Sequence, residues 1–361
     1  MPYPSLKADL LDTDSLPPRQ GPLQRYREKL LILLAGRKVL EIKTAGGTLT
    51  PSAVNAPMAI NLVVAVTDYD WFQALRGRDW PEVNFWAPSG SNFRALQFGE
   101  LFLFKLHSPH DFIVGGGVFA HSMTLPCSIA WETFGPANGA ADLAQMRSRI
   151  LRYRQGDPND RSDFPIGCRV LTQVFFTNED EWLPVPKSWS KNIVSFKTYS
   201  TDNEDGQRLW EWAQGNVIGA VSGIAEEKDR FGEPTLIRPR LGQGAFRVLV
   251  TDAYQRRCAV TGERTLPALD AAHIRPYSEG GEHSVANGLL LRRDIHCLFD
   301  HGYVTVTPDH IFEVSPRIRE QFENGRDYYA LQGKSLTLPH RNELRPELSA
   351  LDWHSTHRFL D

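Results

Sequence analysis

The sequence has 361 residues, of which 41% are hydrophobic, 23% charged and 11% aromatic, and its formal net charge is −3. This is the composition of an ordinary globular protein, and the charge excludes a generally basic nucleic-acid-binding chain. A local basic groove remains compatible with these totals. The length predicts two domains, each large enough for its own core.

Four cysteines are scattered along the chain and form no CxxC pair: Cys127, Cys168, Cys258 and Cys297. This pattern argues against a zinc ribbon and against a disulfide framework, so we expect reduced thiols. The longest apolar runs are too short to span a bilayer, and no signal peptide is recognisable. We therefore expect a cytoplasmic protein without a membrane partner.

The first segments carry little chemistry. Met1 to about Gln20 is rich in proline and polar residues and is expected to be a loose arm. Arg25–Lys43 combines an apolar stripe with basic flanks and is typical of a helix followed by a strand. A packing helix with solvated charges is favoured there over a DNA-backbone contact.

From about Pro57 onward, the pattern predicts short strands and a short helix. The predicted elements are a strand at Asn61–Thr67, a helix at Asp70–Arg76, a strand at Glu82–Trp86, and an antiparallel pair at Glu100–Leu106 and Phe112–Phe119. No lysine or helix start follows Gly115-Gly116-Gly117, so a bulge or a close backbone approach is favoured over a phosphate loop.

Aromatic and polar side chains gather near the ends of these predicted strands. They are Trp71, Trp86, Trp131, Asp68 and Asn84. Short strands with aromatic-rich ends suit a barrel with a pocket at one mouth. For each tryptophan alone, packing in the core is the more common role.

The stretch from Phe85 to Leu106, followed by IVGGGVF and AWETFGPANGA, resembles the PUA-like group of small barrels. That group includes the base-reading EVE- and SRA-type modules. The resemblance implies recognition of a flipped and often modified nucleobase, which needs aromatic faces and a few polar groups at the base edge. The three tryptophans, Asp68 and Asn84 are therefore candidate base-binding residues.

The middle of the chain predicts helices and one boundary. We expect an amphipathic helix with a basic face at Ala140–Arg154, a short helix at Gly206–Gln214, a charged linker at Ala225–Pro239 and a helix at Gly244–Arg256. The resulting division is a domain at 1–200, a helical linker at 201–237 and a second domain at 238–361. The tail after Gly333 is expected to be an appendage of unknown role.

The segment from Arg257 to Val306 concentrates the candidate catalytic residues. It is typical of a strand, a polar loop, a short helix and a returning strand. We expect His273 at the end of the strand, Asn287 at the start of the helix and His296 inside it. Asp300 lies one helical turn after His296, and an imidazole and a carboxylate at this spacing can hold a divalent cation.

These residues resemble an HNH endonuclease of the subgroup with a single cysteine before the first histidine. The matching positions are Arg257 to Gly262, Ala272 to Pro276, Asn287-Gly288, and His296 with Phe299, Asp300 and Gly302. The resemblance implies a ββα-metal fold and hydrolysis of DNA phosphodiesters. It also implies that His273 is the general base, that Asn287 holds the loop of His273, and that His296 binds one divalent metal, expected to be Mg²⁺ or Mn²⁺.

One position departs from the family pattern. Many members carry an acidic metal ligand immediately before the first histidine, where this chain has Ala272. Asp300 or Asp270 can replace that ligand, and the sequence leaves the choice open. DNA-backbone contacts are expected from Arg275, Arg292 and Arg293.

Together these patterns predict an α+β protein with an N-terminal PUA-like β-barrel and a C-terminal HNH domain. The predicted function is a modification-dependent restriction endonuclease that reads modified cytosine in double-stranded DNA, acting as a homodimer because each chain has one active site. Two alternatives stay open: an HNH effector nuclease gated by a small nucleotide or a partner, and a catalytically inactive DNA-binding protein.

Overall fold

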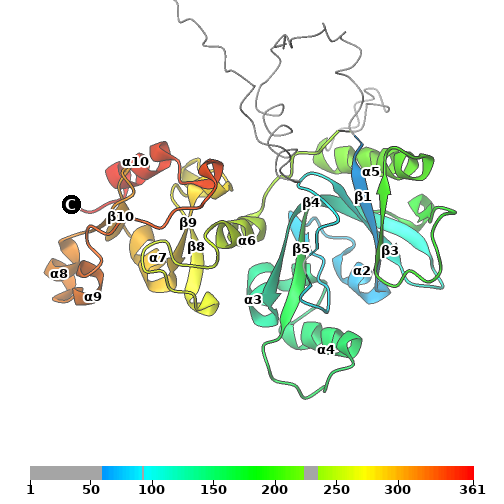
Figure 1. The fold of residues 1–361 in the computed structure, drawn as a ribbon, viewed down its shortest axis with the longest axis horizontal. Coiled ribbons are helices and arrows are strands. Elements are labelled where there is room, and N and C mark those ends of the chain that lie inside the picture. The colour runs from blue at the N-terminus through cyan, green and yellow to red at the C-terminus, as the bar shows by residue number, and fades with distance from the viewer. Residues whose placement is uncertain (1–58, 92, 223–234) are drawn as a thin grey trace, which may run out of the picture. The chain divides into compact units, whose positions relative to one another are not determined.

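The computed structural model describes residues 59–91, 93–222 and 235–361 (Figure 1). The predictions for Met1–Gln20 and Arg25–Lys43, and most of the predicted linker at Ala225–Pro239, lie outside these residues. The described elements are mixed α and β, as the sequence predicts. Contacts between residues group Pro57–Asp361 as one unit, and the boundaries at 200 and 238 stay predictions.

Seven strands form one mixed sheet in the order β2-β5-β4-β3-β1-β7, with β6 paired to β4. Their bounds are β1 (Asn61–Thr67), β2 (Glu82–Asn84), β3 (Leu101–Leu106), β4 (Phe112–Pro126), β5 (Pro165–Phe176), β6 (Leu183–Pro184) and β7 (Phe196–Ser200). β1 runs parallel to β3, and the other pairs are antiparallel. The antiparallel pairing predicted for β3 and β4 is confirmed.

The predicted β-barrel is not closed in the part of the chain that the structure describes. β2 and β7 stand at the two ends of the strand order and do not pair with each other, so the sheet is open. A barrel needs a hydrogen-bond ladder that continues around the whole sheet. β2 supplies only three paired residues, and the chain after it returns to β5 through a single bridge between Ala87 and Gly167.

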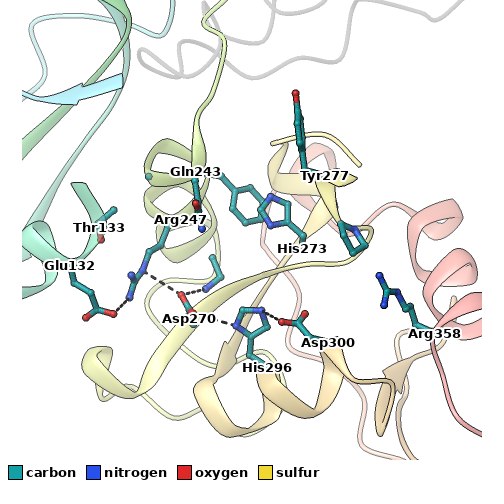
Figure 2. A pocket seen from close by; sticks show the side chains of 14 residues that line it. Glu132, Thr133, Gln243, Arg247, Asp270, His273, Tyr277, His296, Asp300 and Arg358 are labelled. Atoms are coloured by element: carbon teal, nitrogen blue, oxygen red, sulfur yellow. Dashed lines mark hydrogen bonds and ion pairs between the residues drawn. The ribbon is translucent and has the colours of Figure 1, made fainter. Parts of the chain in front are cut away.

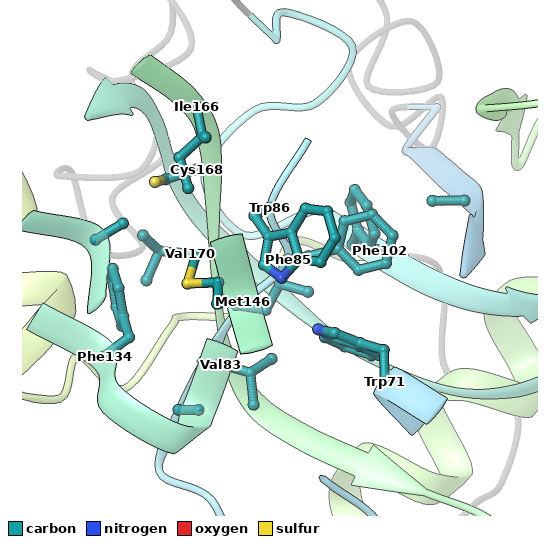
Figure 3. Packing of buried hydrophobic residues seen from close by; sticks show 14 of the residues in the cluster. Trp71, Val83, Phe85, Trp86, Phe102, Phe134, Met146, Ile166, Cys168 and Val170 are labelled. Atoms are coloured by element: carbon teal, nitrogen blue, oxygen red, sulfur yellow. The ribbon is translucent and has the colours of Figure 1, made fainter. Parts of the chain in front are cut away.

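Both faces of the sheet are buried, which explains the almost continuous apolar runs of its central strands. In β3, Phe102 and Phe104 face one core cluster, whereas Leu101 and Leu103 face another, as the two-residue period of a strand requires. The first cluster also contains Trp71, Phe85 and Trp86, and Figure 3 shows Phe85 beside Phe102. The second cluster lies under α5 (Glu204–Ser222) through Leu209, Trp210 and Ala213.

The three consecutive glycines of β4 are sites of close approach, as predicted. A Cβ at Gly115 would lie 2.4 Å from the Phe175 carbonyl oxygen, and one at Gly116 would lie 2.7 Å from Leu103 Cδ2. The register with β5 shifts between Gly116 and Val118. Only glycine lets the neighbouring strands pack this closely.

The remaining helices of this region are α2 (Tyr69–Leu75), α3 (Cys127–Phe134) and α4 (Leu143–Arg154), with short 3-10 turns at Gly135–Asn138 and Glu179–Glu181. α4 confirms the predicted helix and begins three residues later than expected. Its N-cap is Asp142, whose side chain accepts a hydrogen bond of 2.8 Å from the Gln145 backbone N–H. The start of the helix is therefore fixed by this cap.

α6 (Gln243–Ala253) contributes side chains to the hydrophobic clusters of both the N-terminal sheet region and the C-terminal region. Ala245 and Val248 belong to the first core cluster, whereas Phe246 and Val250 belong to the cluster of the C-terminal region. The N-terminus of α6 has a glycine at its N-cap, so no side chain of its own satisfies the free N–H groups. The buried Glu82 carboxylate accepts hydrogen bonds from the N–H groups of residues 244 and 245 instead.

The C-terminal region contains a two-stranded antiparallel sheet and a helix. β8 (Leu269–His273) pairs with β9 (Gly288–Arg292), and α7 (Arg293–Asp300) follows directly. β10 (Val304–Val306) pairs with β11 (Phe312–Val314), followed by α8 (Arg317–Phe322), α9 (Arg326–Tyr329) and α10 (Leu348–His357). Single 3-10 turns lie at Leu266–Ala268, Tyr277–Glu279, Val285–Asn287 and Asn342–Leu344.

Two predictions are wrong in this region. The run Leu289–Leu291 is strand and not helix, so Asn287 precedes β9 and does not open a helix. All three leucines are buried because both faces of β9 are covered, and such a run has no strand periodicity in the sequence. The tail after Gly333 is not an appendage, since α10 packs Ala350 and Leu351 into the core.

Candidate functional site

The β8–β9 pair and α7 bring an imidazole and two carboxylates together. Asp270 lies on β8, and His296 and Asp300 lie one turn apart on α7. Asp270 Oδ2 is 3.3 Å from His296 Nδ1, and Asp300 Oδ2 is 3.2 Å from His296 Nε2 (Figure 2). Both candidates for the missing acidic ligand therefore contact His296, whereas Ala272 is fully buried in the core.

The two carboxylates control the charge on His296. Burial lowers the pKa of this imidazole, but the hydrogen bonds and negative charges of Asp270 and Asp300 outweigh burial and raise it to about 9. For Asp270, burial raises the pKa, but the His296 hydrogen bond and the charge of Arg247 hold it below its usual value. The protonated, positively charged form of His296 is thus favoured between the two carboxylates.

The HNH resemblance implies a divalent metal, and the donor set fits one. Among the described residues, no group of three or more His, Cys, Asp or Glu side chains is already arranged around a vacant ion position. Each nitrogen–oxygen separation is close to the ~3 Å between adjacent ligands of one octahedral cation, but the two carboxylates contact opposite nitrogens of the ring, so a cation at either nitrogen would take His296 and one aspartate. A cation can replace a proton of His296 at the point where the protein already favours positive charge.

His273 lies at the end of β8 and is held on two sides. Its ring stacks on Phe246 of α6 with 3.8 Å between centroids and 11° between planes. Its Nε2 atom is 3.0 Å from Nδ1 of His283 in the following loop. Burial lowers the pKa of His273 to about 4, and the charges of His283 and His296 act in the same direction, so the ring is neutral at pH 7.

Asn287 closes the loop that follows His273. Its Oδ1 accepts a hydrogen bond of 2.9 Å from the Arg275 N–H, and its Nδ2 donates to the carbonyl oxygens of Arg275 and Glu282. A Cβ at Gly281 would lie 1.9 Å from the Arg275 carbonyl oxygen, so the loop folds tightly only with glycine there. The asparagine therefore ties together both ends of residues 275–282.

These residues border a cavity of about 520 Å³ that His273, Asp270, His296 and Asp300 line together. Two arginines that the sequence analysis did not identify also line it, namely Arg247 from α6 and Arg358 after α10 (Figure 2). Neither belongs to a recognisable motif, and both reach the cavity only through tertiary folding. The other lining residues are Glu132, Thr133, Gln243, Gly244, Phe246, Ala271, Pro276 and Tyr277.

The three arginines expected to contact the DNA backbone do not line this cavity. Arg275 donates to the Glu279 carbonyl oxygen and lies over the Trp353 ring, 5.3 Å from its centroid. Arg292 forms an ion pair with Asp294, and Arg293 forms one with Glu132. Glu132 also pairs with Arg247, which in turn lies 3.5 Å from Asp270.

A second cavity, of about 350 Å³, lies beside the sheet of the N-terminal region. Of the five candidate base-binding residues, Asp68, Trp71 and Trp86 line it, whereas Asn84 and Trp131 do not. The other lining residues include Phe85, His107, Tyr153, Arg169, Ser195 and Phe196. Asn84 is fully buried and hydrogen-bonds Asn138, which is a structural role.

Polar groups of both charges line this second cavity. The Asp68 carboxylate accepts a hydrogen bond from the Tyr153 hydroxyl and lies 3.7 Å from His107 Nε2. Arg169 lies over the rings of Phe93, Phe85 and Phe196, and burial lowers its pKa to about 10. Among the described residues no carboxylate pairs with Arg169, and its Nε atom has no hydrogen-bond partner.

The two cavity tryptophans differ in how they are held. Trp71 is 3% exposed, and its ring packs edge-on against Phe85 and Phe104. A Cβ at Gly139 would lie 2.2 Å from Trp71 Cδ1, so this ring rests directly on the backbone of the neighbouring turn. Trp86 donates its indole N–H to the Asn138 carbonyl oxygen at 2.9 Å and lies near the half-exposed Tyr153.

Comparison with known proteins assigns the C-terminal segment. Residues 258–307 match the HNH endonuclease family, so the chain contains an HNH endonuclease domain at this position. No curated protein matches the sequence. No helix among the described residues is long and apolar enough to cross a membrane.

Solved structures with a similar arrangement are distant. The ASCH protein from Zymomonas mobilis is 8% identical, with a TM-score of 0.28 over 41% of this chain and 91% of its own. A modification-dependent restriction endonuclease, TagI, is 14% identical, with a TM-score of 0.24 over 80% of this chain and 79% of its own.

Proposed function

We propose that the protein is a metal-dependent DNA endonuclease that cuts DNA carrying a modified cytosine. The observation that carries the proposal is the cavity in which His273 shares the walls with Asp270, His296 and Asp300. This set lies in the segment that matches the HNH endonuclease family. It combines a neutral base with donors for a cation, which hydrolysis of a phosphodiester requires.

The chain's own residues have separate tasks in this reaction. His273, neutral at pH 7, takes the proton of the water that attacks phosphorus. Arg247 and Arg358 line the same cavity and pair with phosphate oxygens. Asn287 holds the loop after His273 through its three backbone hydrogen bonds.

His296 and one of its two carboxylate partners, Asp270 or Asp300, would hold one divalent cation, for which Mg²⁺ and Mn²⁺ are the proposed ions. When bound, such a cation neutralises charge on the phosphate and on the departing 3′-oxygen. Arg247 contacts Asp270 as well as lining the cavity, so phosphate binding and the position of that carboxylate are linked.

Selectivity must come from another site, because every nucleotide has the same phosphate. The second cavity has aromatic walls for stacking, a carboxylate at Asp68 for the donor groups of a base edge, and a guanidinium at Arg169 for acceptor groups. Extruding a base from the duplex costs a few kcal/mol, which stacking and edge hydrogen bonds must offset. We propose that this cavity receives the modified cytosine.

The test is digestion of matched duplexes that carry cytosine, 5-methylcytosine, 5-hydroxymethylcytosine or glucosylated 5-hydroxymethylcytosine. We expect Mg²⁺- or Mn²⁺-dependent cleavage of at least one modified duplex, much slower cleavage of the unmodified one, and no cleavage in EDTA. Equal cleavage of all four duplexes would remove the modification dependence. Absence of cleavage with either metal on every duplex would overturn the nuclease proposal.

The described residues of one chain form one such cavity, so cutting both strands would need two chains, and we propose a homodimer on DNA. Analytical ultracentrifugation of the protein with a cleavage-resistant modified duplex measures the number of chains bound. A 1:1 complex that makes double-strand breaks in a single binding event would contradict this arrangement.

A further inference from the structure

A second histidine contacts the proposed general base. His283 Nδ1 lies 3.0 Å from His273 Nε2, and the two rings are inclined at 67° with 5.0 Å between centroids. No motif pointed to His283, which lies in a stretch recognised only as turn-forming. The contact leaves Nδ1 as the remaining nitrogen of His273 for a reacting water.

The loop holds His283 firmly in this place. Tyr277 stacks on its ring with 4.8 Å between centroids and 12° between planes. Asn287 Nδ2 donates to the carbonyl oxygen of Glu282, the residue immediately before His283. The Gly281 N–H donates to the Pro276 carbonyl oxygen at 3.0 Å, which closes the turn behind it. Both the ring and its backbone are therefore fixed.

The hydrogen bond between the two imidazoles has two arrangements with opposite consequences. If His273 Nε2–H donates to His283 Nδ1, then His273 Nδ1 carries a lone pair and can accept a proton. If His283 Nδ1–H donates instead, the proton of neutral His273 sits on Nδ1 and the ring has no free lone pair. Only the first arrangement gives a general base.

We propose that His283 is a positioning residue that accepts the Nε2–H of His273 and thereby keeps the lone pair of His273 on Nδ1. This inference rests on the proposed function, in which His273 is the base. When Nδ1 takes the proton of water, the hydroxide oxygen bonds to phosphorus and the bond to the 3′-oxygen breaks. His273 then carries two N–H groups, and Nε2–H remains bonded to the lone pair of His283.

Surrounding features agree with this assignment. Phe246 stacks on one face of the His273 ring, so rotation of this ring about its Cβ–Cγ bond would break the stack. A 180° flip would replace Nε2 with Cε1 and lose the hydrogen bond to His283. Burial lowers the pKa of both histidines, so both rings are neutral at pH 7 and His283 keeps a lone pair to accept the N–H of His273. His283 does not line the cavity, so it acts through His273.

The activity test compares His283→Ala with His283→Asn on the full chain. Loss of the acceptor should lower kcat by about 10- to 100-fold, the range usual for groups that orient a functional histidine, with KM for DNA nearly unchanged. Asn places an acceptor oxygen near the position of Nδ1, so it should restore most of kcat. His340→Ala, at an exposed histidine remote in sequence, should leave kcat unchanged.

Other outcomes in the same experiment would contradict the proposal. Equal kcat for His283→Ala and wild type would overturn it. So would an equal loss in His283→Ala and His283→Asn accompanied by a lower melting temperature in both, because that pattern indicates a purely structural role.

A second measurement does not depend on cleavage. Imidazole ¹⁵N chemical shifts report which nitrogen carries the proton, and the His273 signals are assigned by their absence in His273→Asn. We expect Nε2–H in the wild type and a mixture of tautomers in His283→Ala. A proton on Nδ1 in the wild type, or no change in the variant, would overturn the positioning role. If no DNA is cut, the proposed function fails, while these spectra still decide the role of His283.

Discussion

At the scale of single residues, the central prediction concerns His273. His273→Ala should lower kcat by about 10²- to 10⁴-fold, the usual contribution of a general base. DNA affinity should change little, because phosphate contacts supply most of it. Single-turnover cleavage, DNA binding and melting temperature are measured together. Substantial cleavage by a folded His273→Ala protein would remove this residue from the base role.

Asp270 and Asp300 are tested by their effect on metal affinity. The two carboxylates contact opposite nitrogens of His296, so only the one that shares the cation with it should matter. Either Asp270→Asn or Asp300→Asn should weaken binding of Mn²⁺, measured by calorimetry, by about tenfold or more. Asp309→Asn, at an exposed carboxylate without such a contact, is the matched control. The aspartate whose variant keeps the metal affinity is then a partner of His296 and not a ligand. Unchanged affinity in both variants would exclude both aspartates from the metal site.

Residue order in the sequence predicted His273, Asn287 and His296 as site residues, because a ββα unit takes its main groups from one short segment. It did not identify Arg247, Arg358 or His283. Arg247 lies on α6 and Arg358 directly after α10, on either side of this segment in the sequence, and both meet it only in the folded chain. His283 depends on the exact path of a loop, which turn propensities do not specify.

At the scale of secondary structure, the principal error was the start of α7. A run of buried leucines carries no two-residue period when both faces of a strand are covered, and strand and helix then look alike. The antiparallel pair β3–β4 was predictable because turn residues separate its two apolar runs. The continuation of β4 to Pro126 was not, since its last residues are partly exposed.

α10 supplies a pH-dependent contribution to stability through His354. This ring is 2% exposed, stacks on Phe299, and hydrogen-bonds the Thr305 hydroxyl and the Phe299 carbonyl oxygen. Burial lowers its pKa to about 4, although the Phe299 carbonyl oxygen and the charge of Asp300 act in the opposite direction. The ring is therefore neutral in the folded protein at pH 7.

The sign of the effect follows from this lowered pKa. Between pH 6.5 and about 4 the unfolded chain binds a proton at His354 that the folded chain does not, so stability falls as pH falls through this window. The loss is about 3 kcal/mol and is complete below pH 4. The contribution of His354 is measured as the difference between wild type and His354→Gln in the free energy of urea unfolding at several pH values. Parallel pH profiles for the two proteins would contradict the prediction.

At the scale of the whole molecule, the sequence predicted two chemical centres but not the topology of the first region. Aromatic residues at strand ends indicated a cavity, and a cavity is present, although the sheet that supports it is open. Closure depends on pairing between strands far apart in the sequence, which local patterns do not record. α5 is longer than the predicted helix at Gly206–Gln214, and its contacts with the sheet come from tertiary packing, which local patterns do not record either.

The sequence predicted the same base-binding role for Trp71 and Trp86, but the structure gives the two side chains different surroundings. We therefore expect substitution of Trp71 to affect stability and substitution of Trp86 to affect recognition of the base. Trp71 is enclosed by Phe85, Phe104 and the backbone of Gly139, so Trp71→Ala should lower the free energy of unfolding by about 3–5 kcal/mol. Binding of modified and unmodified duplexes should weaken alike in that variant, because the loss comes from the fold and not from the base.

Trp86 lines the same cavity beside Asp68 and Tyr153, and Trp86→Leu keeps apolar bulk there while removing the stacking face. Aromatic stacking contributes ~1–3 kcal/mol per base, so affinity for the modified duplex should fall about ten- to a hundredfold. Affinity for the unmodified duplex, which rests on phosphate contacts, should stay nearly constant. Fluorescence anisotropy on the two duplexes, with melting temperatures measured in parallel, makes the comparison. A stable Trp86→Leu protein with an unchanged preference for modified DNA would exclude this tryptophan as the stacking platform, and Tyr153 would be the next residue to test.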